Sequence, residues 1–188
     1  MLAQLDRARF GPWALITGAS SGIGREFARQ IAASGINVVL VARREALLRE
    51  AGAEFSKLYG VEHRAVVADL AEEEFLSRLA LATDDLDIGL VISNAGTANA
   101  GEFLRLDRDE LVRLLKLNSL AHMEIAHYFG RRLLQRRRGG ILLCGAMARY
   151  KASRTWRTNL EPSPMCRALA KRCMWNCPRL GSTSAYSS

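Results

Sequence analysis

The sequence of 188 residues contains no apolar run that approaches the roughly 18–20 residues needed to span a membrane. Its first residues also lack the apolar stretch and the flanking pattern of a signal peptide. These two absences predict a protein that has no membrane partner and that resides in the cytoplasm. The length is sufficient for one hydrophobic core and one domain.

Cysteine is scarce, and its spacing does not suit a metal. Three of the four cysteines, Cys166, Cys173 and Cys177, follow residue 149. Cys173 and Cys177 form one pair with three residues between them, whereas a zinc site usually takes a second matching pair. The sequence therefore predicts no metal site.

Acidic residues are almost absent from the C-terminal part. Residues 1–148 carry a net charge of +1, whereas residues 149–188 carry +7 with Glu161 as their one acid. Almost all of the total charge of +8 therefore belongs to the tail, and we expect no nucleic-acid partner. The basic run at residues 131–138 ends a predicted helix, where cations complement the helix dipole. We interpret this run as a solvated helix end, the alternative being a phosphate-binding patch.

A glycine-rich turn stands between a predicted strand and a predicted helix. The apolar run Trp13-Ala14-Leu15-Ile16 precedes Thr17-Gly18-Ala19-Ser20-Ser21-Gly22-Ile23-Gly24, and residues 25–34 follow with a helical apolar face. Gly18 permits a tight exit from the strand, Gly22 permits close approach to phosphates, and Gly24 permits close packing of the helix. The helix N-terminus would face the anion. The pattern favours a pyrophosphate site over a turn that binds nothing.

The residues after the second predicted strand indicate which dinucleotide is bound. Residues 37–42 form a buried apolar run that ends at Arg43-Arg44. An acidic residue at this point would bind a ribose 2′-hydroxyl, whereas arginines suit a 2′-phosphate. The sequence therefore predicts NADP as the cofactor, with NAD less favoured. The alternative is that both arginines belong to a solvated helix start.

The spacing of the glycines resembles that of the short-chain dehydrogenase/reductase family, and four later motifs continue the resemblance over residues 11–148. Each motif lies at or just after a predicted strand or helix. The resemblance implies that Asp69 binds near the adenine, that Asn94 steadies the sheet and lines the cofactor cleft, and that Asn118 is catalytic, kinks a helix and holds a relay water. The motifs are Asp69-Leu70, Asn94-Ala95-Gly96, Leu117-Asn118-Ser119 and the strand Gly139-Gly140-Ile141-Leu142-Leu143.

Alternating apolar runs and helical segments predict an α/β fold, a Rossmann-like doubly wound parallel sheet that is truncated after about the fifth strand. We expect helices between the strands. The strands are expected near Ala14–Thr17, Val38–Ala42, Ala65–Ala68, Leu90–Ser93 and Ile141–Cys144.

The catalytic positions of the family are not matched. Alignment on the fifth strand places Ala146, Asn159 and Ser163 where the family carries its Ser, Tyr and Lys, and no Tyr-x-x-x-Lys occurs anywhere in the chain. In the family the Tyr is the general acid, the Lys lowers its pKa, and the Ser orients the substrate carbonyl. The resemblance thus implies an impaired enzyme.

The composition changes at about residue 149, so we divide the chain into a dinucleotide-binding domain, 1–148, and an aberrant basic tail, 149–188, which we expect to be poorly ordered. Met174-Trp175-Asn176-Cys177 is encoded by ATG TGG AAY TGY, and a shifted reading gives Val-Glu-Leu. Other tail segments permit family-like strings in the same shifted frame, although Thr158-Asn159 yields no Tyr codon. We interpret the tail as an out-of-frame reading of a longer gene.

Three functions stay open at this point. The first is an NADP-dependent oxidoreductase that moves hydride to or from a small carbonyl or alcohol substrate. The second is a nucleotide-binding remnant without chemistry. The third is an interaction protein that uses its basic tail. The resemblance allows a homo-oligomer, but a fold that is truncated after about the fifth strand makes one doubtful for this chain.

Overall fold

A computed structural model describes residues 5–100, 103–145 and 157–158 and contains one five-stranded parallel sheet. The strand order is β3-β2-β1-β4-β6. The predicted parallel sheet is confirmed, and each predicted strand lies within one or two residues of an observed one. The observed strands are β1 Trp13–Thr17, β2 Asn37–Ala42, β3 His63–Val67, β4 Ile88–Ser93 and β6 Gly140–Leu143.

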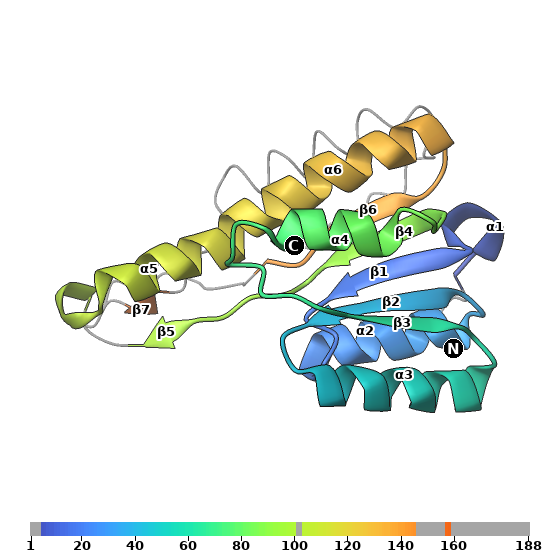
Figure 1. The fold of residues 1–188 in the computed structure, drawn as a ribbon, viewed down its shortest axis with the longest axis horizontal. Coiled ribbons are helices and arrows are strands. Elements are labelled where there is room, and N and C mark those ends of the chain that lie inside the picture. The colour runs from blue at the N-terminus through green and yellow to red at the C-terminus, as the bar shows by residue number, and fades with distance from the viewer. Residues whose placement is uncertain (1–4, 101–102, 146–156, 159–188) are drawn as a thin grey trace, which may run out of the picture.

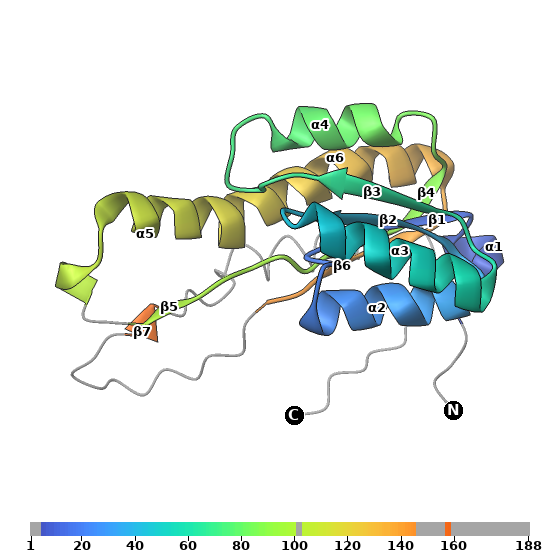
Figure 2. The same cartoon turned by 60° about the horizontal axis from the view of Figure 1, so that its bottom comes forward.

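The helices cover both faces of the sheet, as the doubly wound pattern predicts (Figures 1 and 2). Helix α2, Gly22–Ala33, and helix α3, Glu45–Tyr59, pack on one face. Helix α4, Phe75–Thr83, and helix α6, Ala121–Arg136, pack on the other. Because successive side chains of a strand point to opposite faces, both faces of a central strand must be apolar, and continuous apolar runs result.

Strand β1 shows this division of the core residue by residue. Ala14 and Ile16 pack with the α2 and α3 layer, whereas Leu15 packs with the α4 and α6 layer, and all three are fully buried. Strands β2 and β4 follow the same alternation. The two half-cores fix the register of the sheet, since a slip of one residue would exchange the two faces.

Shorter elements connect these layers. They are α1 Arg7–Phe10, the 3₁₀ turn η1 Phe103–Arg105, α5 Arg108–Leu115, the π-helical turn η2 Lys116–Leu120, and two short strands, β5 Asn99–Ala100 and β7 Arg157–Thr158. The short strands pair antiparallel with each other. Helix α5 and this pair extend away from the sheet beyond the carboxyl ends of its strands (Figure 1). Helix α5 leads through η2 into α6, which lies against the sheet.

The basic run at the end of α6 is not the solvated helix end that the sequence suggests. Arg132 donates to the backbone carbonyls of Thr83 and Leu86, at 3.1 and 3.0 Å. Arg136 is only 9% exposed, and it binds Asp87 as well as the carbonyls of Arg9 and Gly11. These two arginines face inward and join α6 to neighbouring loops. The interpretation fails for them because helical periodicity places them on the packed side of α6.

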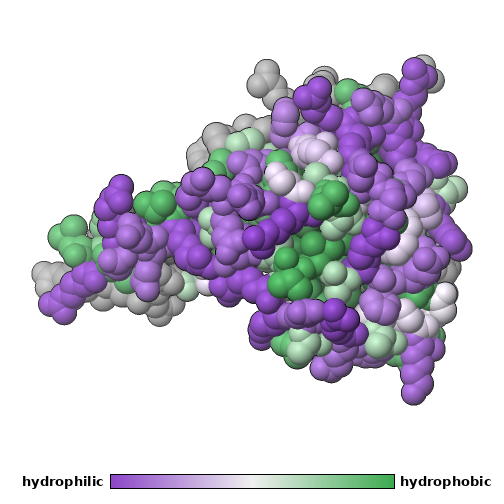
Figure 3. Space-filling view, viewed as in Figure 1, coloured by the Kyte–Doolittle hydropathy of each residue, from purple (hydrophilic) through white to green (hydrophobic). Residues whose placement is uncertain are grey.

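The surface in the view of Figure 3 is mostly hydrophilic, with an apolar area near its centre between α4 and α3, where the edge strand β3 lies. Val67 at the end of β3 is 43% exposed. In the described part of the chain, no helix combines the length and apolarity needed to cross a membrane. The same part holds no group of three metal-ligating side chains.

Several predictions from the sequence concern residues outside the described ranges. They are the state and origin of the tail, the substitutions Ala146, Asn159 and Ser163 at the family's catalytic positions, and the three cysteines after residue 149. These remain predictions from the sequence.

Candidate functional site

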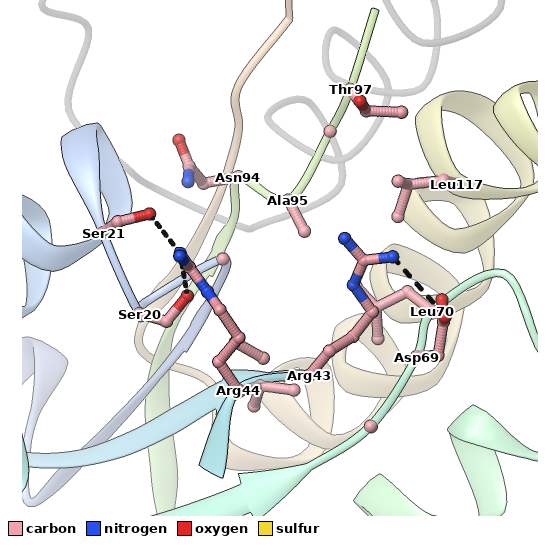
Figure 4. A pocket seen from close by; sticks show the side chains of 15 residues that line it. Ser20, Ser21, Arg43, Arg44, Asp69, Leu70, Asn94, Ala95, Thr97 and Leu117 are labelled. Atoms are coloured by element: carbon pink, nitrogen blue, oxygen red, sulfur yellow. Dashed lines mark hydrogen bonds and ion pairs between the residues drawn. The ribbon is translucent and has the colours of Figure 1, made fainter. Parts of the chain in front are cut away.

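A cleft of about 280 Å³ opens at the carboxyl ends of the parallel strands (Figure 4). In open α/β sheets, ligands bind outside the carboxyl ends of the strands, where the strand order reverses. Strand β1 is that point here, because β2 and β4 lie on either side of it. The cleft is lined by Gly18, Ser20, Ser21, Val41, Ala42, Arg43, Arg44, Ala68, Asp69, Leu70, Asn94, Ala95, Gly96, Thr97 and Leu117.

The glycine-rich turn forms one wall and depends on its missing side chains. Gly18 has a φ of +71°, and a Cβ there would lie 3.0 Å from the Asn94 amide nitrogen. A Cβ at Gly24 would overlap the Gly18 carbonyl and lie 2.7 Å from the same amide nitrogen. Gly24 thus lets α2 begin directly against the turn and Asn94. Gly22 has a φ of +57° and open space around its Cβ position, which leaves the backbone accessible from the solvent side.

Arg44 lies beside the N-terminus of α2. The Ser21 side chain makes no capping hydrogen bond to this helix of 12 residues. Arg44 Nη2 instead donates to Ser20 Oγ at 2.9 Å and to Ser21 Oγ at 2.6 Å (Figure 4). A guanidinium therefore lies beside the first backbone N–H groups of α2, which suits an anionic ligand.

Arg43 and Arg44 are neighbours in the sequence but diverge in space (Figure 4). Arg43 Nη1 lies 3.8 Å from Asp69 Oδ2, across the cleft from the serines. Asp69 also receives Arg113 of α5 on the same oxygen. The sequence predicts one shared role for the two arginines, whereas the structure gives each a different neighbour. Strand β2 ends without a carboxylate, so no acid occupies the place of a ribose-hydroxyl acceptor.

Thr17 at the end of β1 connects the ends of β1 and β4. It precedes the glycines of the turn, but the sequence did not identify it as a site residue. Its hydroxyl accepts from the backbone N–H groups of Asn94 and Ala95, at 2.9 and 3.0 Å. The Asn94 side-chain amide returns a hydrogen bond to the Thr17 carbonyl at 3.3 Å. Asn94 therefore ties the ends of β1 and β4 together, consistent with the role in the sheet that the resemblance implies.

Asn118 lies in the π-helical turn η2 between α5 and α6. Its Oδ1 accepts from the Thr97 backbone N–H at 3.0 Å, and its Nδ2 donates to the Thr97 carbonyl at 2.6 Å. The side chain is thus fixed to the irregular segment that follows Asn94-Ala95-Gly96. The expected irregularity of the helix at Asn118 is present as this π turn, which is a common feature of functional sites.

A buried polar pair, Ser93 and His122, lies next to the segment that lines the cleft. Ser93 Oγ lies 2.7 Å from His122 Nδ1, and both side chains are buried. Burial lowers the pKa of His122 below its usual 6.5, against the opposing effect of a hydrogen bond with the Ala95 backbone. His122 is therefore neutral near pH 7 and positions the segment that carries Asn94 and Ala95.

Most of the predicted cofactor residues meet in the cleft. Gly22, Ile23 and Gly24 form the first turn of α2 at its edge, and Ile23 is 71% exposed. Asn118 does not line the cleft but holds Thr97, which does. The sequence did not identify Thr97, which stands in no motif, or Leu117, whose motif pointed only to Asn118. The glycine turn, the free α2 N-terminus and the two arginines fit a phosphate-bearing dinucleotide.

Comparison with known proteins assigns this arrangement to one family. The family model for short chain dehydrogenases matches residues 12–157. A very-long-chain 3-oxoacyl-CoA reductase of Laccaria bicolor is 35% identical over 145 residues, which cover 75% of this chain and 43% of the relative. A 7beta-hydroxysteroid dehydrogenase of Collinsella aerofaciens is 30% identical over 147 residues, which cover 78% of this chain and 56% of the relative.

The solved structures agree with the curated relatives. A short-chain dehydrogenase from Sphingobium yanoikuyae, solved in complex with NADPH, is 36% identical and superimposes with a TM-score of 0.69. The match covers 73% of this chain and 54% of that one. The chain thus spans about half the length of the proteins it matches. On the match to the family model, which agrees with the strand order and the glycine turn, the chain belongs to the short-chain dehydrogenase/reductase family.

Proposed function

We propose that this chain binds NADP(H) in the cleft at the ends of β1, β2 and β4. The observation that carries the proposal is Arg44, held by the Ser20 and Ser21 hydroxyls beside the N-terminus of α2. The turn from Gly18 to Gly22 would hold the pyrophosphate, and the arginines would pair with the 2′-phosphate. The NADPH complex of the Sphingobium yanoikuyae relative supports the choice of cofactor.

By family, the reaction is hydride transfer between the nicotinamide and a small carbonyl or alcohol substrate. When bound, the nicotinamide supplies or accepts the hydride. The alkoxide formed from a ketone needs a proton, which a positioned general acid supplies with a gain of about 10²–10⁴. The sequence places Asn159 and Ser163 where the family has Tyr and Lys. We infer that this chain binds the cofactor and turns over slowly or not at all.

Cofactor choice is tested by measuring the affinities of NADPH and NADH for the full chain and for Arg44→Ala. Charge-assisted hydrogen bonds contribute about 1.5–3 kcal/mol, so the variant should lose roughly 10- to 100-fold in NADPH affinity and much less in NADH affinity. Arg49→Ala is the matched control, because Arg49 pairs with Glu45 on the exposed face of α3. Equal losses for the two cofactors would contradict the assignment.

The lack of turnover is tested separately by following NADPH absorbance with a panel of ketones. We expect no substrate-dependent oxidation above the background, although NADPH binds. Rapid reduction of any ketone by the purified chain would contradict the proposed impairment and leave the binding assignment standing.

A further inference from the structure

Helix α5 reaches back to the adenine side of the cleft through Arg113. Its guanidinium contacts Asp69 Oδ2, and it comes from a helix that otherwise extends away from the sheet (Figure 1). One turn further along, Lys116 Nζ lies 3.3 Å from Glu73 Oε1. These two ion pairs join the end of α5 and the start of η2 to the segment that follows β3.

The carboxylate of Asp69 is almost fully engaged. Its Oδ1 accepts from the Ala71 backbone N–H at 3.0 Å, and its Oδ2 is taken by Arg113. The Asp69 side chain is only 16% exposed, whereas Arg113 is 50% exposed. Asp69 is therefore held in one orientation by partners on two sides.

Arg43 competes for the same carboxylate oxygen and holds it more loosely. Its Nη1 lies 3.8 Å from Asp69 Oδ2, beyond hydrogen-bond distance, and its side chain is 67% exposed. A guanidinium that is not hydrogen-bonded to a carboxylate keeps its donors for another anion. Figure 4 shows the Arg43 guanidinium in the cleft, with one of its amino groups turned toward Asp69.

We infer that Arg113 is a positioning residue that sets cofactor selectivity by occupying Asp69 and so leaving Arg43 free for the 2′-phosphate. The inference rests on the proposed binding of NADP. Without Arg113, the carboxylate of Asp69 would pair with Arg43, because no other described cation lies near it. That pairing would remove one of the two arginine charges available to the 2′-phosphate, whereas contacts common to NADP and NAD would stay.

The first test measures the ratio of NADPH to NADH affinity in Arg113→Gln by titration of the full chain. A partly exposed pair of this kind changes affinities by small factors, so the ratio should fall about three- to fivefold. Arg113→Lys should retain most of the ratio, because it keeps the charge beside Asp69. Lys116→Gln is the matched control, since it breaks the neighbouring ion pair between η2 and Glu73 and should leave the ratio unchanged.

A double-mutant cycle separates this role from a direct effect of the Arg113 charge. In an Asp69→Asn background no carboxylate remains to capture Arg43, so Arg113→Gln should leave the affinity ratio unchanged there. An equal fall in both backgrounds, or no fall with Asp69 present, would overturn the inference. Failure of the unmodified chain to bind NADPH would instead contradict the proposed function, and with it this inference.

Discussion

Thr17 illustrates how a single hydroxyl defines the geometry of the cleft. It accepts two consecutive backbone N–H groups, those of Asn94 and Ala95, which lie beyond the end of β4. Backbone donors at the end of a buried strand need partners, because an unpaired buried N–H costs about 1–3 kcal/mol. The hydroxyl supplies them and so fixes where the segment lining the cleft leaves the sheet.

From His122, which lies beside Ser93 at the end of β4, we predict how the stability depends on pH. Burial lowers its pKa in the folded chain, whereas in the unfolded chain the pKa stays near 6.5. Below that value the unfolded chain binds the proton first, so the free energy of unfolding falls as the pH falls through 6.5 toward the folded pKa. Between about pH 7.5 and 5.5 we expect a loss of up to about 1.4 kcal/mol, measured by urea unfolding.

The variant His122→Gln should flatten this part of the pH profile, whatever it does to the stability itself. His127→Gln is the control for the loss of an imidazole from α6, because His127 is exposed on the same helix. Persistence of the full loss in His122→Gln would show that another group causes it.

At the scale of the elements, the contacts of Arg136 predict a large loss of stability when this side chain is removed. It joins the end of α6 to Asp87 and to the carbonyls of Arg9 and Gly11 near α1. Arg136→Ala leaves these carbonyls without their charged donor, so the free energy of unfolding should fall by about 2–3 kcal/mol in urea titrations.

Arg131→Ala is the control for this substitution, since Arg131 lies exposed on the same helix. Its loss should change the stability by no more than about 0.5 kcal/mol, as is usual for surface positions. Comparable losses for the two variants would contradict the inward role of Arg136.

The elements themselves were largely predictable, because apolar runs mark strands that are buried on both faces. The main errors of the sequence-based prediction concern where helices begin and where charged side chains point. Helix α2 begins at Gly22, three residues earlier than the predicted Arg25. The period of α6 places Arg132 and Arg136 on its packed side, but their partners could not be predicted, since they lie in loops that α6 meets only in the folded chain.

At the scale of the whole molecule, motifs located the cleft, but contacts distant in sequence complete it. Asp69 was expected from the family pattern, whereas its partner Arg113 stands 44 residues away in no motif. Thr97 was missed for the same reason, because its partner Asn118 stands 21 residues further along the chain. Pairings of this kind follow from how helices pack on the sheet, so a single sequence does not reveal them.

Because the cleft joins the ends of β1, β2 and β4 with the segment after β3, a ligand bound there should stabilise the whole sheet. A ligand that binds only the folded state adds about 2.7 kcal/mol at a concentration 100 times its Kd. NADPH should therefore shift the urea midpoint upward, and NADH at the same concentration should shift it less. In Arg44→Ala the NADPH shift should shrink toward that of NADH, because the 2′-phosphate loses its partner. An NADPH concentration series without any shift would contradict binding at this cleft.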